Sequence, residues 1–323
     1  MSDLVVITDA DLPGTERILE LLHAAGLRAT LARCRTEADV AEAAAGASAL
    51  MVQWAPVTGE ALDRLPDCRF IVRLGVGYDM IDVSAATARG IAVANNPDYC
   101  VEEVAAHTIA LIMAAGRRLF ELDRAVRHGR WSAAEDAPAA LRPSRTTLGV
   151  VGFGRIGSRT AAHAAALGFR VVVSDPYVPG HVIESAGHQA ATLAETLGAA
   201  DVLSLHLPLT GGTRHLLDRP ALARLPRGAL VVNTCRGGLV DEAALADAIK
   251  RGHLAGAALD VFEAEPLPGD SPLRDLPGVI LSPHAAWYSP HSPAELGEST
   301  ARKVVDFLAG RPVPSIVNPE YAR

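Results

Sequence analysis

Short apolar runs alternate along the chain with alanine-rich segments of helical length. In the first hundred residues the apolar runs occupy positions 4–8, 49–53, 69–74 and 91–94. Helical patterns lie between them at positions 14–25, 59–65 and 81–89. Continuous apolar runs of this length are typical of parallel strands that are buried on both faces. The alternation therefore predicts an α/β sheet with right-handed crossover connections.

A second series of the same kind follows the longest helical stretch, which runs from position 101 to about 129. Its apolar runs occupy positions 147–151, 170–174, 201–207, 229–234, 256–261 and 279–281. The two series predict two α/β lobes, with chain crossings at the turns 95–100 and 282–289. A last helix near 294–309 belongs to neither series by its pattern alone.

Composition narrows the class of protein. The chain has 323 residues, 49% of them hydrophobic and 21% charged, with a formal net charge of −7. This length favours two domains, and the lack of a Lys/Arg run argues against nucleic acid or a membrane surface as partner. The four scattered cysteines form no C-x-x-C pair, which argues against a zinc site or disulfides and fits a cytoplasmic protein. The N-terminal residues lack the pattern of a signal peptide. Glu102, Glu103 and His107 argue against a membrane span at 101–115 and favour a buried amphipathic helix.

A glycine triplet follows the first apolar run of the second lobe. Gly152, Gly154 and Gly157 form a G-x-G-x-x-G between a predicted strand and a predicted helix, and Arg155 adds a positive charge. This order is typical of a turn that binds the diphosphate of a dinucleotide at a helix N-terminus. Asp175 ends the next strand, 18 positions after Gly157, where a carboxylate can bind the adenosine ribose. No arginine that could bind a 2′-phosphate follows Asp175 closely, which favours NAD over NADP. The alternative interpretation of Asp175 is an acidic N-cap after a strand.

Three later predicted strands end in charged residues. Arg236, Glu265 and His284 each follow one of them. An enzyme that reduces a carbonyl needs a cation to hold and polarise its substrate and an acid that titrates near neutral pH. Arg236 suits the first task and His284 the second, with Glu265 placed to favour the protonated ring. Glu263 competes with Glu265 for this role, and each residue alone also fits an ordinary surface position.

These motifs together resemble one enzyme family. The segments VGFGRIG with Asp175, NTCRGGLVDE, ALDVFEAEPLP and SPHAAWYS are similar to those of the D-2-hydroxyacid dehydrogenases, which include phosphoglycerate dehydrogenase, glyoxylate and hydroxypyruvate reductases and D-lactate dehydrogenase. The resemblance implies an NAD-dependent oxidoreductase that transfers a hydride between NAD(H) and a D-2-hydroxy or 2-keto acid. It further implies two Rossmann-like lobes, with an NAD-binding domain at 99–287 inserted into a flavodoxin-like substrate domain at 1–98 and 288–323. The family also pairs as homodimers through the helix near 101–118.

The resemblance assigns roles residue by residue. Arg236, Glu265 and His284 are the expected catalytic residues, and no metal is expected. The expected cofactor-binding residues are Thr108, Gly152, Gly154, Arg155, Ile156, Gly157, Asp175, Thr234, Cys235 and Asp260.

A narrower likeness concerns the substrate. The segments LGVGYDMID and HAAWYS resemble those of the C-terminal binding proteins, the corepressor branch of the family. This likeness suggests Trp54, Arg73, Val76, Gly77 and Trp287 as substrate-binding residues, with packing as the alternative role for Trp287. Trp54 departs from that branch, which carries histidine there. An NAD-sensing corepressor-like binding protein and a phosphite dehydrogenase stay open as alternatives, whereas formate dehydrogenase is disfavoured because it has glutamine in place of Glu265.

Overall fold

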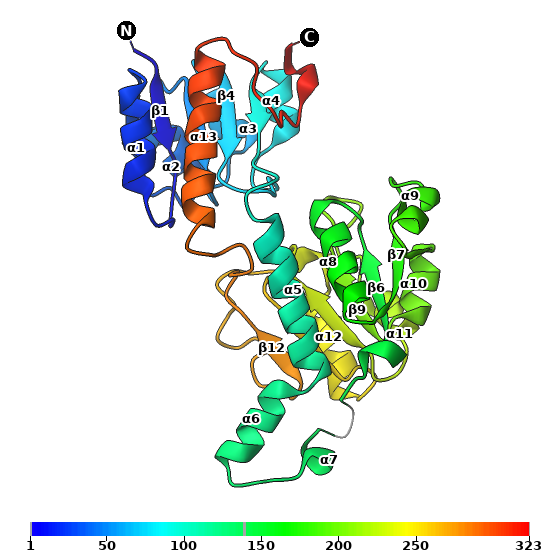
Figure 1. Cartoon of the computed structure of the whole chain (residues 1–323). Helices are drawn as coiled ribbons and strands as arrows, with labels where there is room; N and C mark the ends of the chain where they lie inside the picture. The colour runs from blue at the N-terminus through cyan, green and yellow to red at the C-terminus, as the bar shows by residue number, and fades with distance from the viewer. Residues whose placement is uncertain (1, 138–139, 323) are drawn as a thin grey trace. The chain divides into compact units, whose positions relative to one another are not determined.

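The protein forms two compact units. The computed structural model describes residues 2–137 and 140–322. Unit 1 comprises Met1–Cys100 and Tyr288–Arg323, and unit 2 comprises Val101–Trp287. The two ends of the chain therefore belong to one unit and the middle to the other (Figure 1).

Unit 1 is built on a parallel sheet of five strands. The strands follow the order β2-β1-β3-β4-β5, which is the flavodoxin-like arrangement. Its elements are β1 (Leu4–Ile7), α1 (Thr15–Ala24), β2 (Arg28–Leu31), α2 (Glu37–Ala43), β3 (Ala49–Val52), α3 (Gly59–Asp63), β4 (Phe70–Arg73), α4 (Val83–Ala88), β5 (Ala92–Ala94), α13 (Ser292–Leu308) and the 3₁₀ turn η3 (Pro319–Ala322).

Helices cover both faces of this sheet. Neighbouring residues of β4 point to opposite faces, as the pleat requires. Ile71 belongs to the apolar cluster under α2, α3 and α4, whereas Phe70 stacks on Phe307 of α13 with ring centroids 4.4 Å apart. The helix α13 lies against α1 and β4, so the final helix belongs to the first lobe (Figure 1).

The sequence pattern missed β2 and α2. Three of the four residues of β2 are exposed because this strand lies at the edge of the sheet, so it carries no continuous apolar run. The short helix α2 is capped by Thr36, which forms a reciprocal capping box with Asp39.

Unit 2 is built on a parallel sheet of seven strands in the order β12-β11-β10-β9-β6-β7-β8. If β6 to β11 are numbered 1 to 6 along the chain, they lie in the Rossmann order 3-2-1-4-5-6. The strand β12 extends the sheet next to β11. The predicted fold class is confirmed. Its elements are α5 (Val101–Gly116), α6 (Leu119–Arg127), α7 (Ala133–Asp136), η1 (Pro143–Arg145), β6 (Thr147–Val151), α8 (Arg155–Ala166), β7 (Arg170–Ser174), α9 (Gly180–Ser185), β8 (Gln189–Ala190), α10 (Leu193–Ala199), β9 (Val202–Leu205), α11 (Arg219–Arg224), β10 (Leu230–Asn233), η2 (Gly237–Leu239), α12 (Glu242–Lys250), β11 (Gly256–Leu259) and β12 (Val279–Leu281).

The expectation of one long helix from 101 to about 129 was wrong. The stretch is two helices, α5 and α6, and Arg118 between them has a left-handed φ of 58°. Arg118 Nη1 donates to the Ala255 carbonyl and pairs with Glu121. These contacts stabilise a break that the apolar pattern alone does not reveal.

Both faces of the second sheet are buried. Val231 of β10 points into the cluster under α10, α11 and α12, and its neighbours Leu230 and Val232 point into the cluster under α5 and α8. This double burial explains the continuous apolar runs, and it leaves the ends of the strands as the places where polar side chains gather.

Candidate active site

The glycine turn at the end of β6 has three glycines in three different environments. Gly152 has a φ of 98°, and a Cβ there would lie 2.2 Å from the His206 carbonyl oxygen. A Cβ on Gly157 would lie 2.1 Å from the Gly152 carbonyl oxygen, whereas one on Gly154 would meet no described atom within 4 Å. Gly152 and Gly157 therefore allow the chain to pack on itself, and Gly154 leaves room for a ligand.

Asp175 is tied to this turn. Its Oδ2 accepts a hydrogen bond from the Phe153 N–H at 2.7 Å, and its Oδ1 accepts from the N–H groups of Tyr177 and Val178 at 2.8 and 3.2 Å. The carboxylate is therefore held in one orientation beside the glycine turn. This bracing role was not visible in the sequence, since residues 22 positions apart make the bond.

The turn fits a dinucleotide. Gly154 is the N-cap of α8, and within the described chain no side chain caps this helix. Arg155 and Ile156 form its first turn, with Arg155 exposed and Ile156 half-buried. N–H groups at an uncapped helix N-terminus, an open glycine and an adjacent carboxylate are the donors and acceptor that a diphosphate and a ribose require.

The polar residues predicted beside the cofactor also meet. Thr108 of α5 shares a hydrogen bond of 2.8 Å with Thr234, and both residues are buried. Cys235 donates its thiol hydrogen to the Leu205 carbonyl. Burial raises the pKa of Cys235 to about 12, so the thiol is neutral and is no nucleophile.

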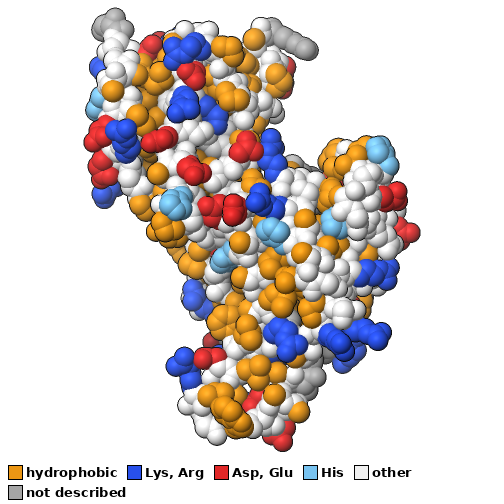
Figure 2. Space-filling view, viewed as in Figure 1, with side chains coloured by type: hydrophobic (Ala, Val, Ile, Leu, Met, Phe, Trp, Pro, Cys, Tyr) orange, Lys and Arg blue, Asp and Glu red, His pale blue; other side chains and the backbone are white. Residues whose placement is uncertain are grey.

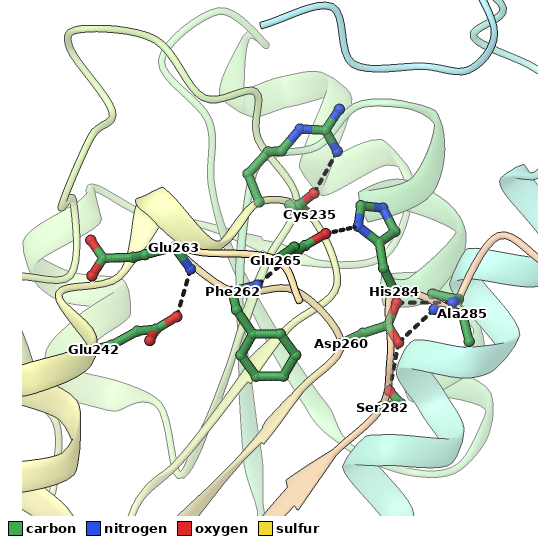
Figure 3. A network of polar contacts seen from close by, with 11 residues as sticks. Cys235, Glu242, Asp260, Phe262, Glu263, Glu265, Ser282, His284 and Ala285 are labelled. Atoms are coloured by element: carbon green, nitrogen blue, oxygen red, sulfur yellow. Dashed lines mark hydrogen bonds and ion pairs between the residues drawn. The ribbon is translucent and has the colours of Figure 1, made fainter. Parts of the chain in front are cut away.

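Glu265 and His284 form a hydrogen-bonded pair (Figure 3). His284 Nδ1 lies 2.7 Å from Glu265 Oε2, and the other carboxylate oxygen accepts the Phe262 N–H at 2.9 Å. Burial alone raises the pKa of Glu265. The hydrogen bond and charge of His284, the Phe262 N–H and the charge of Arg236 outweigh burial, and the pKa of Glu265 falls below its ordinary value.

The competing carboxylate points elsewhere. Glu263 pairs with Nε2 of His215. Its N–H donates to Glu242 at 2.6 Å, as Figure 3 shows. The choice between Glu263 and Glu265, which the sequence left open, is thus settled by geometry in favour of Glu265.

Asp260 organises the loop that carries His284. Its buried carboxylate accepts hydrogen bonds from Ser282 Oγ and from the N–H groups of Ala285 and Ala286, and its carbonyl accepts the His284 N–H at 2.8 Å. His284 has a left-handed φ of 52°, a conformation that a non-glycine residue holds only when its surroundings impose it. Figure 3 shows Asp260 below His284, with Ser282 and Ala285 beside its carboxylate. Trp287, two positions beyond Ala285, is half-buried.

Arg236 lies just after the end of β10, the strand beside β11 in the sheet. A Cβ on the following residue, Gly237, would lie 1.8 Å from the Phe262 carbonyl carbon, so only glycine lets the segment after β10 pass this close to the segment after β11. Arg236 Nη1 donates to the Cys235 carbonyl at 2.8 Å. This packing places the guanidinium where its charge acts on Glu265.

In unit 1 the predicted substrate residues Trp54 and Arg73 touch. The Arg73 guanidinium carbon lies 5.0 Å from the centroid of the Trp54 ring, a cation–π distance. The buried Asp9 fixes the backbone that carries the indole, because its carboxylate accepts the backbone N–H groups of Gln53 and Trp54 at 3.1 and 2.6 Å. Asp9 follows β1 and Trp54 follows β3, the two strands between which the strand order reverses.

Val76 and Gly77 lie half-buried in the loop after β4. Among the described groups, none accepts a hydrogen bond from the N–H of either residue. Asn95 and Asn96 bind the carbonyl groups of this loop. Neither asparagine was expected as a site residue from the sequence, where their only signal is a pair of polar residues at the end of an apolar run.

Two further observations concern the described residues as a whole. They contain no group of three or more His, Cys, Asp or Glu side chains placed to hold a metal ion. Among them, no helix is both long enough and apolar enough to cross a membrane.

Comparison with known proteins identifies the family. Residues 109–286 match the profile of the D-isomer specific 2-hydroxyacid dehydrogenase, NAD binding domain. A glyoxylate reductase of Korarchaeum cryptofilum is 40% identical over 83% of this chain and 81% of its own length. A D-3-phosphoglycerate dehydrogenase of Mycobacterium leprae is 41% identical over 84% of this chain, which spans only 51% of that relative.

Among solved structures, the D-lactate dehydrogenase of Aquifex aeolicus, in complex with NAD and lactic acid, is 30% identical. It has a TM-score of 0.87 and covers 95% of this chain and 96% of its own. The fold and site thus define an NAD(P)-dependent oxidoreductase of the two-lobe Rossmann type. The chain belongs to the D-isomer specific 2-hydroxyacid dehydrogenase family, as the sequence motifs predicted.

Proposed function

We propose that the protein reduces small 2-keto acids to D-2-hydroxy acids with NADH, using Arg236, Glu265 and His284. The observation that carries this proposal is the hydrogen bond between His284 Nδ1 and Glu265 Oε2, with Arg236 close enough for its charge to act on Glu265. An imidazole held by a carboxylate and flanked by a guanidinium suits proton transfer to the oxygen of an anionic keto acid.

His284 acts as the proton donor in this scheme. A carboxylate only accepts hydrogen bonds, so Nδ1 carries the hydrogen that faces Glu265. The proton for the substrate oxygen then comes from Nε2, and the ionised Glu265 stabilises the imidazolium that precedes the transfer. In the oxidation of the hydroxy acid the same Nε2 accepts the proton back.

Arg236 holds the substrate. Its planar guanidinium can bind a carboxylate through two parallel N–H groups and can polarise the neighbouring keto oxygen. The orientation of the arginine is fixed by its bond to the Cys235 carbonyl and by the close packing of Gly237 on Phe262.

The glycine turn and Asp175 select the cofactor. NADH, when bound, supplies the hydride. Gly152, Gly154, Arg155, Ile156 and Gly157 hold the diphosphate, and the braced Asp175 carboxylate accepts a ribose hydroxyl. The Asp175 charge repels the 2′-phosphate of NADPH. Thr108, Thr234, Cys235 and Asp260 form the polar wall on the nicotinamide side.

Unit 1 supplies residues for the substrate. The N–H groups of Val76 and Gly77 are suited to a carboxylate, and Arg73 adds positive charge beside them. Trp54, whose backbone N–H is held by Asp9, provides an apolar wall that favours small substrates. Trp287, the last residue of unit 2, is the fifth proposed substrate-binding residue.

A homodimer is the proposed assembly. Unit 2 exposes four large apolar side chains on and just after α6: Leu119 at 53%, Phe120 at 57%, Val126 at 53% and Trp131 at 88%. Figure 2 shows apolar side chains gathered at the end of unit 2 where Figure 1 places α6. An apolar patch of this kind is typical of an interface between subunits. The four cysteines form no disulfide among themselves, which favours the reducing cytoplasm as the location.

One assay tests the proposed activity. NADH oxidation is followed with glyoxylate, hydroxypyruvate, pyruvate and bulkier apolar 2-keto acids, and phosphite is tested separately for NAD reduction. We expect turnover with the small keto acids, and chiral analysis should identify the product of a prochiral substrate as the D isomer. NAD reduction by phosphite without keto acid turnover, or NADH binding without any turnover, would contradict the proposal.

A further inference from the structure

A cluster of buried polar side chains lies directly behind the loop of Val76 and Gly77. It consists of Asn95 and Asn96, which follow β5, and of Ser299, Thr300 and Lys303 on α13. Lys303 is only 6% exposed and Asn96 only 2%. A buried ammonium group loses its hydration, so its retention calls for an explanation.

The two asparagines hold three carbonyl groups of the loop. Asn96 Nδ2 donates to the Arg73 carbonyl at 2.8 Å, and the Asn96 N–H donates to the Gly75 carbonyl at 2.9 Å. Asn95 Nδ2 donates to the Val76 carbonyl at 2.7 Å. The whole loop is thereby bound through its oxygen atoms.

This binding sets the direction of the N–H groups. In a trans peptide the C=O of one residue and the N–H of the next point in opposite directions. Because Asn96 binds the Gly75 carbonyl, the Val76 N–H points away from the cluster. Because Asn95 binds the Val76 carbonyl, the Gly77 N–H does the same. Neither of these N–H groups donates to a described acceptor.

Lys303 determines how the Asn96 amide is turned. Lys303 Nζ donates to Asn96 Oδ1 at 2.5 Å, and Ser299 Oγ donates to the same oxygen at 2.9 Å. With its oxygen held on that side, the amide must present Nδ2 to the Arg73 carbonyl and to Thr300 Oγ1, which lies at 2.9 Å. Burial lowers the pKa of Lys303, and the charge of Asp98 opposes that shift.

We propose that Lys303 is a positioning residue for substrate binding: it fixes the Asn96 amide, which in turn aims the Val76 and Gly77 N–H groups at the substrate carboxylate. Lys303 itself is buried behind the loop and acts only through Asn96. The inference rests on the proposed function of this loop as a carboxylate site. It assigns to the family's substrate site a lysine from the last helix of the chain, more than 220 positions away from the loop.

The test compares Lys303→Met with Arg302→Met, which removes an exposed charge from the next position of the same helix. Displacement of the loop by a fraction of an ångström should raise the KM for the best keto acid by about ten- to a hundredfold. The kcat should change only a few-fold, and the Kd for NADH, whose proposed site lies in unit 2, should be unchanged. Arg302→Met should match the wild type in all three.

A second variant keeps the test decisive if Lys303→Met does not fold. Asn96→Asp retains the bond to Lys303 but replaces the amide hydrogens that bind the Arg73 carbonyl, so it should raise KM in the same way. A lowered melting temperature with wild-type KM in the variants that fold would overturn the inference while leaving the proposed function intact. Absence of turnover in the wild type would overturn the proposed function and this inference with it.

Discussion

The imidazole of His284 and the carboxylate of Glu265 are joined by a hydrogen bond of 2.7 Å between Nδ1 and Oε2. The two residues are brought together because β11 and β12 are neighbours in a parallel sheet, and each residue follows one of these strands. The remaining oxygen of Glu265 is fixed by the Phe262 N–H. The ring is therefore held through Nδ1 by a carboxylate that is itself fixed, as a proton donor requires.

Removing the charge of Glu265 should change the pH dependence of reduction. The pKa of Glu265 lies below its ordinary value, so the wild-type carboxylate is ionised at any pH above that ordinary value. In Glu265→Gln the protonated imidazole loses this stabilising charge. The rate of keto acid reduction should then decline at a lower pH than in the wild type, with the rate at acidic pH better preserved than the rate at neutral pH. The measurement is kcat between pH 5 and 9.

Glu263→Gln is the matched control for that profile. Glu263 lies two positions away and pairs with His215 instead of His284. Its substitution should leave the descending limb of the profile near its wild-type pH. An equal shift in both variants would show that the pH profile depends on the total negative charge of the region and not on the pair of His284 and Glu265.

Arg236→Lys should impair binding and chemistry together. A lysine ammonium is a point charge and cannot offer two parallel N–H groups to a carboxylate. We expect a higher KM for the keto acid and a lower kcat, with the Kd for NADH unchanged. Separate determination of kcat and KM checks this, and wild-type values of both would remove Arg236 from the site.

Asp175→Asn should relax the choice of cofactor. Like-charge repulsion and lost ribose hydrogen bonds should make the wild type prefer NADH by roughly a hundredfold in kcat/KM, which corresponds to about 2.7 kcal/mol. Removal of the charge should narrow this preference by about tenfold. Asp201→Asn is the control, because Asp201 also accepts a backbone N–H in this sheet, from Thr147 at the opposite end of β6. Equal use of NADPH and NADH by the wild type would refute the assignment.

Phe120→Asp should dissociate the dimer. Phe120 is 57% exposed on α6, and a charge in an apolar interface is costly because it is desolvated without a partner. Sedimentation velocity at micromolar concentration should show a dimer for the wild type and a monomer for the variant. Val182→Asp, which charges an exposed apolar position on α9, should stay dimeric. A monomeric wild type would contradict the proposed assembly.

The sequence predicts much of the fold for a physical reason. Buried parallel strands require continuous apolar runs, and runs such as 147–151 and 170–174 match β6 and β7 residue for residue. The edge strand β2 was not predicted because it is largely exposed. The break at Arg118 was not predicted because a hydrogen bond to the Ala255 carbonyl, 137 positions away, stabilises it. Tertiary contacts of this kind leave no local pattern.

The candidate site shows the same division. Arg236, Glu265 and His284 could be picked out because each follows a predicted strand end, and such ends meet at one edge of a parallel sheet. The residues that support them could not be predicted from the sequence. Asp260 and Asn96 act through hydrogen bonds to backbone groups 24 to 26 and 21 to 23 positions away, respectively, and such bonds depend on the folded geometry alone.

The central claim is that His284 donates the proton to the substrate, and its most direct test is the kcat of His284→Ala on the best keto acid. The account predicts a loss of about 10²–10⁴-fold, the range typical of a missing general acid, with an unchanged Kd for NADH. His215→Ala is the matched control, because His215 also has a left-handed backbone and a glutamate partner, and it should keep its kcat within a few-fold of the wild type. A His284→Ala enzyme with near wild-type kcat would contradict the account.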